Sequence, residues 1–142
     1  MTGKHAKRNA RPGVDRAGRA PLHYAAVDGV VSEAIRLLRT GADPNAQDDD
    51  GRTPLHFACQ ESSAEIVRAL IAAGAKVDTR DGYGNTPLST AVFNSRGNGA
   101  IIALLRAAGA DPHAANDSGV TPLSLARSVG NFDLAQFFAD LP

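Results

Sequence analysis

The chain has 142 residues, about 43% of them apolar, which is the length and composition of one folded soluble domain. Fifteen basic and fifteen acidic residues cancel, so no bulk charge points to nucleic acid or a membrane surface as the partner. A single cysteine excludes an intramolecular disulfide and a cysteine-cluster metal site, and no apolar run approaches the roughly 20 residues of a membrane span.

The first segment, residues 1–14, is basic and has no apolar stretch behind its charges, so we expect a flexible arm and not a secretory signal. Without a secretory route and with one cysteine, a cytoplasmic location is predicted. Residues 1–19 carry six Lys or Arg and one Asp, a net charge of +5 that the rest of the chain balances. Such an arm offers one alternative function, which is weak, salt-sensitive binding to nucleic acid or another anionic surface.

From Asp15 onward the sequence repeats itself. The pattern T-P-L or A-P-L, followed by two residues and an alanine, recurs at intervals of 33, 33 and 35 residues, starting at Ala20, Thr53, Thr86 and Thr121. A second marker keeps the same register, with GADPN, GAKVD and GADPH starting at Gly41, Gly74 and Gly109. Two markers in one register predict a tandem structural unit. The expected units are residues 15–47, 48–80, 81–115 and 116–142, which form a single domain over 15–142.

Each unit has a local physical interpretation. In Thr53-Pro54 a capping hydroxyl precedes a proline at the first helical position, where its missing N–H costs nothing. A second helix follows with apolar residues at helical spacing, such as Ile66, Val67 and Leu70, and Gly74 supplies its left-handed stop. The next ten or so residues are rich in Asp, Asn and Gly, which is the chemistry of turns. The predicted unit is helix, turn, helix, hairpin.

Such units cannot bury their apolar stripes alone, so the copies must stack into a solenoid. The pattern D-x-x-G-x-T-P-L-H-x-A-A with a following G-A-D resembles the ankyrin repeat family from about Asp15 to the C-terminus. The resemblance implies an all-α repeat solenoid of ankyrin repeats, each a helix-turn-helix plus a β-hairpin loop. Three repeats are full, and the shortened C-terminal repeat lacks a G-A-D.

Several residues are of types that bind metals or act in catalysis, but their positions in the repeat do not support such a role. His23 and His56 occupy one position in successive repeats, so about 8–10 Å should separate them, too far for one zinc ion. In the ankyrin family a histidine at this position braces the neighbouring hairpin. Cys59 replaces an alanine of the inner helix, which indicates a buried structural thiol. No nucleophile, base and orienting group come together, so we expect no enzyme, no cofactor and no metal site.

The resemblance also implies a binding surface, because partners of ankyrin-like stacks meet the concave side, built from hairpin tips and late positions of the inner helices. The residues of this surface that come first in the chain are mostly acidic. Those that come later include two aromatic side chains and an arginine, residue types that often anchor interfaces. The predicted partner-binding residues are Asp28, Asp49, Asp50, Arg52, Gln60, Glu61, Tyr83, Asn85, Phe93, Asn94 and Arg96.

The turn between the two helices of the third repeat is two residues longer than its counterpart, FNSRGNG in place of QESSA. Gly97, Asn98 and Gly99 predict a loop with positive φ that lifts Arg96 clear of the stack. The extension either contributes a contact surface or reflects neutral drift, since exposed turns accept insertions at small cost.

Together these features predict a non-enzymatic protein–protein interaction module that binds another protein through a concave, partly acidic face. Small stand-alone ankyrin proteins of bacteria look similar, and some of those are thought to be immunity or inhibitor partners of toxins. An acidic face suits a basic partner. We expect a monomer without a membrane partner, with an apolar C-terminal end available for association through Phe132, Phe137, Phe138 and Leu141.

Overall fold

The computed structural model describes residues 12–128 and 133–142. Within them the chain forms seven α-helices, one 3-10 helix and no β-strand. The elements in chain order are α2 (Pro21–Asp28), α3 (Val31–Arg39), α4 (Pro54–Gln60), α5 (Ala64–Ala72), α6 (Pro87–Asn94), α7 (Ala100–Ala107), α8 (Pro122–Ser128) and the 3-10 helix η1 (Leu134–Phe138).

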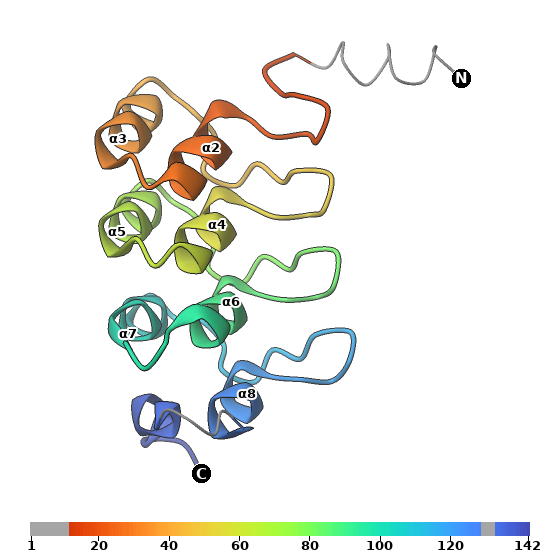
Figure 1. The fold of residues 1–142 in the computed structure, drawn as a ribbon, viewed down its shortest axis with the longest axis vertical. Helices are drawn as coiled ribbons and strands as arrows, with labels where there is room; N and C mark the ends of the chain where they lie inside the picture. Colours follow the sequence, from red (N-terminus) through yellow and green to blue (C-terminus); the bar gives the residue numbers. More distant parts are fainter. Residues whose placement is uncertain (1–11, 129–132) are drawn as a thin grey trace.

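The elements stack in four layers, each made of an inner and an outer helix (Figure 1). The inner helices α2, α4, α6 and α8 form one column, and α3, α5, α7 and η1 form the other. Each inner helix packs against the next inner helix, and α3, α5 and α7 pack in the same order. Long loops project beyond the inner column, one from each layer (Figure 1). The predicted all-α solenoid is confirmed.

The inner helices begin at the predicted prolines because the preceding residue caps them. The Thr53 Oγ1 accepts the N–H of His56 at 3.3 Å, and the Thr53 N–H donates to His56 Nδ1 at 3.1 Å. Ala20 has no hydroxyl, and there only the second bond forms, from its N–H to His23 Nδ1 at 2.9 Å. Two donors at the helix start are satisfied locally at Thr53 and Thr121, whereas at Thr86 only the Ser89 N–H is accepted, at 3.4 Å.

The core lies between the two columns. The leucine of every T-P-L or A-P-L motif is almost completely buried, and so are the matching apolar residues of the outer helices, which makes one continuous core across the layers. Each fully buried leucine contributes about 1.5–3 kcal/mol. The buried residues of these two kinds are Leu22, Leu55, Leu88, Leu123, Val67, Leu70, Ile102 and Leu105.

Each projecting loop is closed by an Asp or Asn side chain. In the second repeat the Asp48 carboxylate accepts the N–H groups of Asp50 and Arg52 at 3.0 and 2.9 Å. The loops of neighbouring repeats are also joined through their backbones, as where the Gly82 N–H donates to the Asp50 carbonyl at 2.7 Å. Backbone hydrogen bonds therefore join the loops into a continuous row along the stack, although none of their residues is in a strand.

The fourth repeat departs from the prediction. In place of a full second helix, the segment has the five-residue η1, and Phe132 lies outside the described residues. Arg106 of α7 donates to the Phe137 carbonyl at 2.9 Å and to the Asp140 carboxylate at 2.6 Å, which ties this segment to the third repeat. Phe138 is only 1% exposed, and Phe137 and Leu141 are half-buried against the core. Association through this end stays a prediction, with less apolar surface to support it.

The extended turn of the third repeat also differs from its prediction. Positive φ occurs at Arg96 and Gly97, at 50° and 90°, whereas Gly99 has a φ of −89°. Arg96 is exposed, as expected. Gly99 is buried because the ring of Phe137 lies over it, so closely that a methyl group at Gly99 would overlap the ring. The insertion thus contributes to the support of the C-terminal segment as well as to the surface.

Candidate functional site

A groove of about 870 Å³ lies between the loops and the inner helices of the second, third and fourth repeats. Nine of the eleven predicted binding residues line it, namely Asp50, Arg52, Gln60, Glu61, Tyr83, Asn85, Phe93, Asn94 and Arg96. The tertiary structure therefore brings most of the predicted set onto one concave surface. Their contact with a partner stays a prediction.

The two other predicted residues lie outside the groove. Asp28 is exposed at the C-terminal end of α2. Asp49 stands at a loop tip, where its N–H donates to the Ala17 carbonyl at 2.8 Å and its carboxylate packs over Gly18. The acidic part of the predicted surface is thus divided, because Asp50 and Glu61 alone of its four carboxylates face the groove.

Six further residues line the groove that are not among the eleven predicted binding residues: Asp81, Ser89, Thr90, Asn116, Val120 and Leu125. One signal could have found some of them. Ser89 occupies the repeat position of His23 and His56, and Thr90 occupies that of Tyr24 and Phe57, so the third repeat has small side chains where the first two have rings.

Two aromatic rings are exposed at the groove. Phe93 is 75% exposed near the end of α6, and Tyr83 is 74% exposed in the loop before that helix. The backbone of Tyr83 is fixed, because its N–H donates to the Asp81 carboxylate at 2.9 Å and its carbonyl accepts the Asp117 N–H at 3.0 Å. Large rings on a fixed backbone are suited to anchor a bound surface.

The groove also holds charged groups of both signs. Its carboxylates are Asp50, Glu61 and Asp81, and its cations are Arg52 and Arg96. None of these five belongs to an ion pair within the described part of the chain. The Arg52 guanidinium instead lies 4.4 Å from the centre of the Phe57 ring. The groove is therefore slightly acidic and its charges are available to a ligand.

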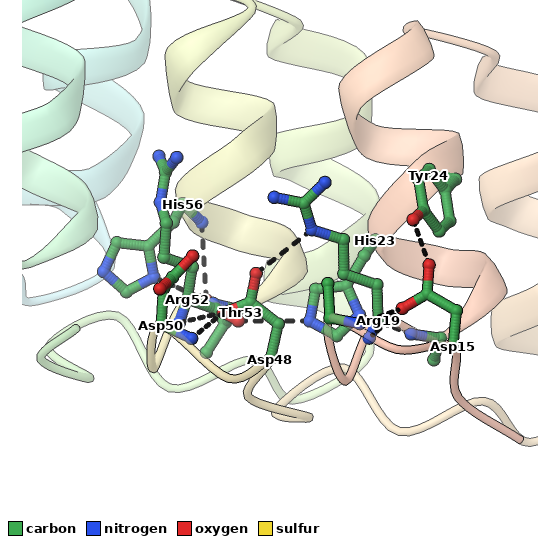
Figure 2. A network of polar contacts seen from close by, with 11 residues as sticks. Asp15, Arg19, His23, Tyr24, Asp48, Asp50, Arg52, Thr53 and His56 are labelled. Atoms are coloured by element: carbon green, nitrogen blue, oxygen red, sulfur yellow. Dashed lines mark hydrogen bonds and ion pairs between the residues drawn. The ribbon is translucent and has the colours of Figure 1, made fainter. Parts of the chain in front are cut away.

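The part of the concave side nearer the N-terminus is occupied by contacts within the chain, as Figure 2 shows. The Tyr24 hydroxyl donates to the Asp15 carboxylate, which lowers the pKa of Asp15 and raises that of Tyr24. Arg19 Nε donates to the Asp48 carboxylate at 3.3 Å, with its guanidinium 5.0 Å from the centre of the Phe57 ring. Arg19 and Asp48 are thus paired with each other, whereas the five charged groups of the groove form no ion pair among the described residues.

The two inner-helix histidines are structural, as predicted. His23 Nε2 lies 3.1 Å from the Arg52 carbonyl oxygen in the loop of the next repeat (Figure 2). His56 Nε2 lies 2.9 Å from the Asn85 carbonyl oxygen, again in the loop of the next repeat. Burial lowers the pKa of His56, so its ring is neutral and donates from Nε2. Each ring braces two layers, and that role occupies both of its nitrogens.

Cys59 is 1% exposed among the core residues, and burial raises the pKa of its thiol. Within residues 12–128 and 133–142, no three His, Cys, Asp or Glu side chains are grouped so that they could hold a metal ion. In the same residues, no helix has the length and apolar character needed to cross a membrane.

The repeat architecture has a counterpart among known families. A profile described as ankyrin repeats (3 copies) matches residues 22–116, about two thirds of the chain. The chain belongs to the ankyrin repeat family. Ankyrin repeats are generally non-catalytic modules for protein–protein interaction. A search of curated proteins found none that matches this chain.

Proposed function

We propose that this ankyrin protein is a non-enzymatic binding module that recognises a partner protein through the groove of its second to fourth repeats. The observation that carries the proposal is the exposure of Tyr83 and Phe93 beside unpaired charges in one groove. Rings of this size, three-quarters exposed, are costly in water and effective anchors when a partner covers them.

We further propose that the partner is a basic protein met in the cytoplasm. Asp50, Glu61 and Asp81 line the groove, and Asp28 and Asp49 add negative charge nearby. Complementary charge of this kind speeds association and suppresses wrong partners. A basic toxin that the chain inhibits, as an immunity protein would, is one partner with this chemistry.

The test is to tag the protein, purify it from its own cells, identify what is retained and measure its affinity for each variant. Tyr83→Ala and Phe93→Ala should each weaken the complex by about tenfold or more. Val30→Ala serves as the control, because Val30 is also an exposed apolar residue, 45% exposed, but lies outside the groove. A partner that binds all three variants with the affinity of the natural chain would contradict the proposal.

Charge reversal provides an independent test. Asp50→Lys and Glu61→Lys should slow association with a basic partner, most strongly at low salt. Glu65→Lys and Asp78→Lys make the same change at exposed positions outside the groove and should leave the association rate close to that of the natural chain. Equal effects of the two pairs would indicate general charge attraction and not recognition at the groove.

The alternative function, phosphate or anionic-surface binding through residues 1–14, rests on the charge of that segment alone. Most of it lies outside the described residues. Deleting residues 1–14 separates the two proposals, since recognition by the groove should survive the deletion and salt-sensitive binding to nucleic acid should not.

A further inference from the structure

The junction between the third and fourth repeats differs from the two junctions before it. At those earlier junctions the His23 and His56 rings reach a carbonyl oxygen of the next loop, at 3.1 and 2.9 Å. The equivalent residue of the third repeat is Ser89, whose side chain is too short to span this gap. The matching acceptor in the fourth repeat is the Val120 carbonyl, which within the described residues accepts only the Asn116 N–H, at 2.8 Å.

The side chain at the next position is also smaller in the third repeat than in the first two. Tyr24 and Phe57 follow the two histidines, and the Phe57 ring packs edge-on against the His23 ring with 5.9 Å between their centres. The third repeat has Thr90 there instead. Both Ser89 and Thr90 line the groove, together with Val120 and Leu125 of the next repeat. Thr90 leaves the third repeat without the ring that Phe57 packs against the preceding repeat, and Ser89 leaves it without the imidazole that reaches the following one, so both positions open into the groove.

An ion pair present earlier in the stack is missing as well. Arg19 of the first repeat pairs with Asp48 of the second at 3.3 Å. The equivalent residues one repeat later, Arg52 of the second repeat and Asp81 of the third, form no ion pair within the described residues, and the Arg52 guanidinium lies 4.4 Å from the centre of the Phe57 ring. Asp81 therefore presents a carboxylate to the groove, and its backbone contacts use one of its two oxygens.

The first of these differences lies at the junction of the third and fourth repeats and the other two lie at the junction of the second and third, but all of them line one groove, and together they describe a receptor for one kind of side chain. The Val120 carbonyl can only accept, and the Thr90 hydroxyl donates to the Thr86 carbonyl at 3.4 Å and keeps its lone pairs, so the group that fits carries N–H donors. Leu125 and Val120 offer apolar contact for an aliphatic stem. The groove carboxylates and the exposed rings of Tyr83 and Phe93 favour a positive charge.

We infer that the junction of the third and fourth repeats is a specificity pocket that takes an arginine or lysine side chain of the partner protein, with its N–H groups at the Val120 carbonyl in place of the absent imidazole. This inference rests on the proposed function and identifies the feature of the partner that the groove selects. The bound side chain supplies the donor that His23 and His56 supply within the chain.

The decisive variant is Ser89→His, which restores the residue of the first two repeats. The new imidazole should bond to the Val120 carbonyl and fill the pocket, so the variant should unfold at the same or a higher urea concentration while losing partner binding. Thr90→Phe restores the ring at the next position and fills the neighbouring part of the same groove. Ser124→His is the matched control, because Ser124 holds the same repeat position but is exposed and outside the groove.

The experiment uses the full chain and short random peptides displayed on phage. Peptides are selected on the natural chain, and those that lose affinity for Phe93→Ala are kept as groove ligands. We expect these ligands to contain one basic residue whose replacement by norleucine or glutamate reduces affinity by about tenfold or more. We expect the same loss when the protein carries Ser89→His or Thr90→Phe, and none with Ser124→His. Exchanging Arg and Lys in the peptide then shows which cation the pocket prefers.

Two results would overturn the inference. Groove ligands that tolerate norleucine at every basic position would show that no cation is selected. Groove ligands that bind the folded Ser89→His variant with the same affinity as the natural chain would show that the pocket is not used. Both results would leave the proposed function standing, because the ligands still depend on Phe93, whereas failure to select any Phe93-dependent peptide would count against the proposed function too.

Discussion

The Nε2 atom of His56 lies 2.9 Å from the carbonyl oxygen of Asn85, and the Nδ1 atom of the same ring accepts the N–H of Thr53 at 3.1 Å. One neutral imidazole therefore caps its own helix and ties that helix to the next repeat. Replacement by serine keeps the possibility of a cap, since Ser124 Oγ accepts the Thr121 N–H at 2.9 Å in the fourth repeat. The inter-repeat bond, however, would be lost.

We expect His56→Ser to lower the free energy of unfolding by about 1–3 kcal/mol, because the imidazole N–H no longer reaches the Asn85 carbonyl and packing around the ring is lost. Urea unfolding followed by circular dichroism measures the change. His113→Ser, at an exposed position, is the control and should be neutral within about 0.5 kcal/mol. Equal stability of the two variants would show that the bridge does not stabilise the stack.

The same histidine makes stability depend on pH. Burial lowers the pKa of His56 below its ordinary value near 6.5, and this outweighs the carboxylates of Asp81 and Asp48, which favour the charged ring. The unfolded chain then binds a proton that the folded chain resists, so stability is complete above about pH 6.5 and falls as the pH drops below it. Urea midpoints near pH 7.5 and pH 5.5 should differ more for the natural chain than for His56→Ser.

Gly99→Ala should destabilise the protein by about 1–3 kcal/mol, although alanine suits the φ of −89° at this position. The cause is overlap of the new methyl group with the Phe137 ring. In a Phe137→Ala background the substitution should cost much less, so that the two changes are not additive in a double-mutant cycle. Additive effects would mean that the ring does not rest on Gly99.

The C-terminal segment is also held by charge. Hydrogen bonds from the Arg106 guanidinium hold the pKa of Asp140 at about 2, below its usual 3.8. The ion pair therefore contributes fully above about pH 4 and is lost as the pH falls from there toward 2. Carboxyl NMR titration of the natural chain and of Arg106→Gln checks this, and the Asp140 pKa should rise toward 3.8 in the variant. An unchanged pKa would show that the pair does not form in solution.

Cys59 should be unreactive in the folded protein, because it is 1% exposed and burial raises the pKa of its thiol. A thiol reagent such as DTNB at mildly alkaline pH should label none of it without denaturant and one equivalent in urea. Ser62→Cys, at an exposed turn position, provides the reactive control. Rapid labelling of Cys59 in the native protein would contradict the buried assignment.

Much of the architecture could be predicted from local chemistry. Thr53-Pro54 and its counterparts start the inner helices wherever they occur, since a hydroxyl cap and a fixed proline φ act within a few residues. The 33-residue register then placed His23 and His56 against their neighbouring loops, because equivalent residues of stacked copies meet equivalent surroundings. The same register assigned nine residues of the groove correctly to one surface.

The remaining features depend on contacts between residues distant in the sequence, which no local pattern encodes. Arg106 bonds to Phe137 and Asp140, which lie 31 and 34 positions further along the chain, and so holds the short 3-10 helix of the last repeat against the third repeat. Phe137 covers Gly99, which turns a glycine of an apparently exposed insertion into a packing site. The repeat register shows that Ser89 replaces a histidine, but only the structure shows that the Val120 carbonyl lacks the bond its counterparts accept and that this junction opens into the groove. The sequence by itself therefore determined the repeat, the starts of its helices and which residues lie on the concave side of the stack. Only the tertiary structure decided how the last repeat is held and where the groove is open, because both depend on which side chains meet across layers.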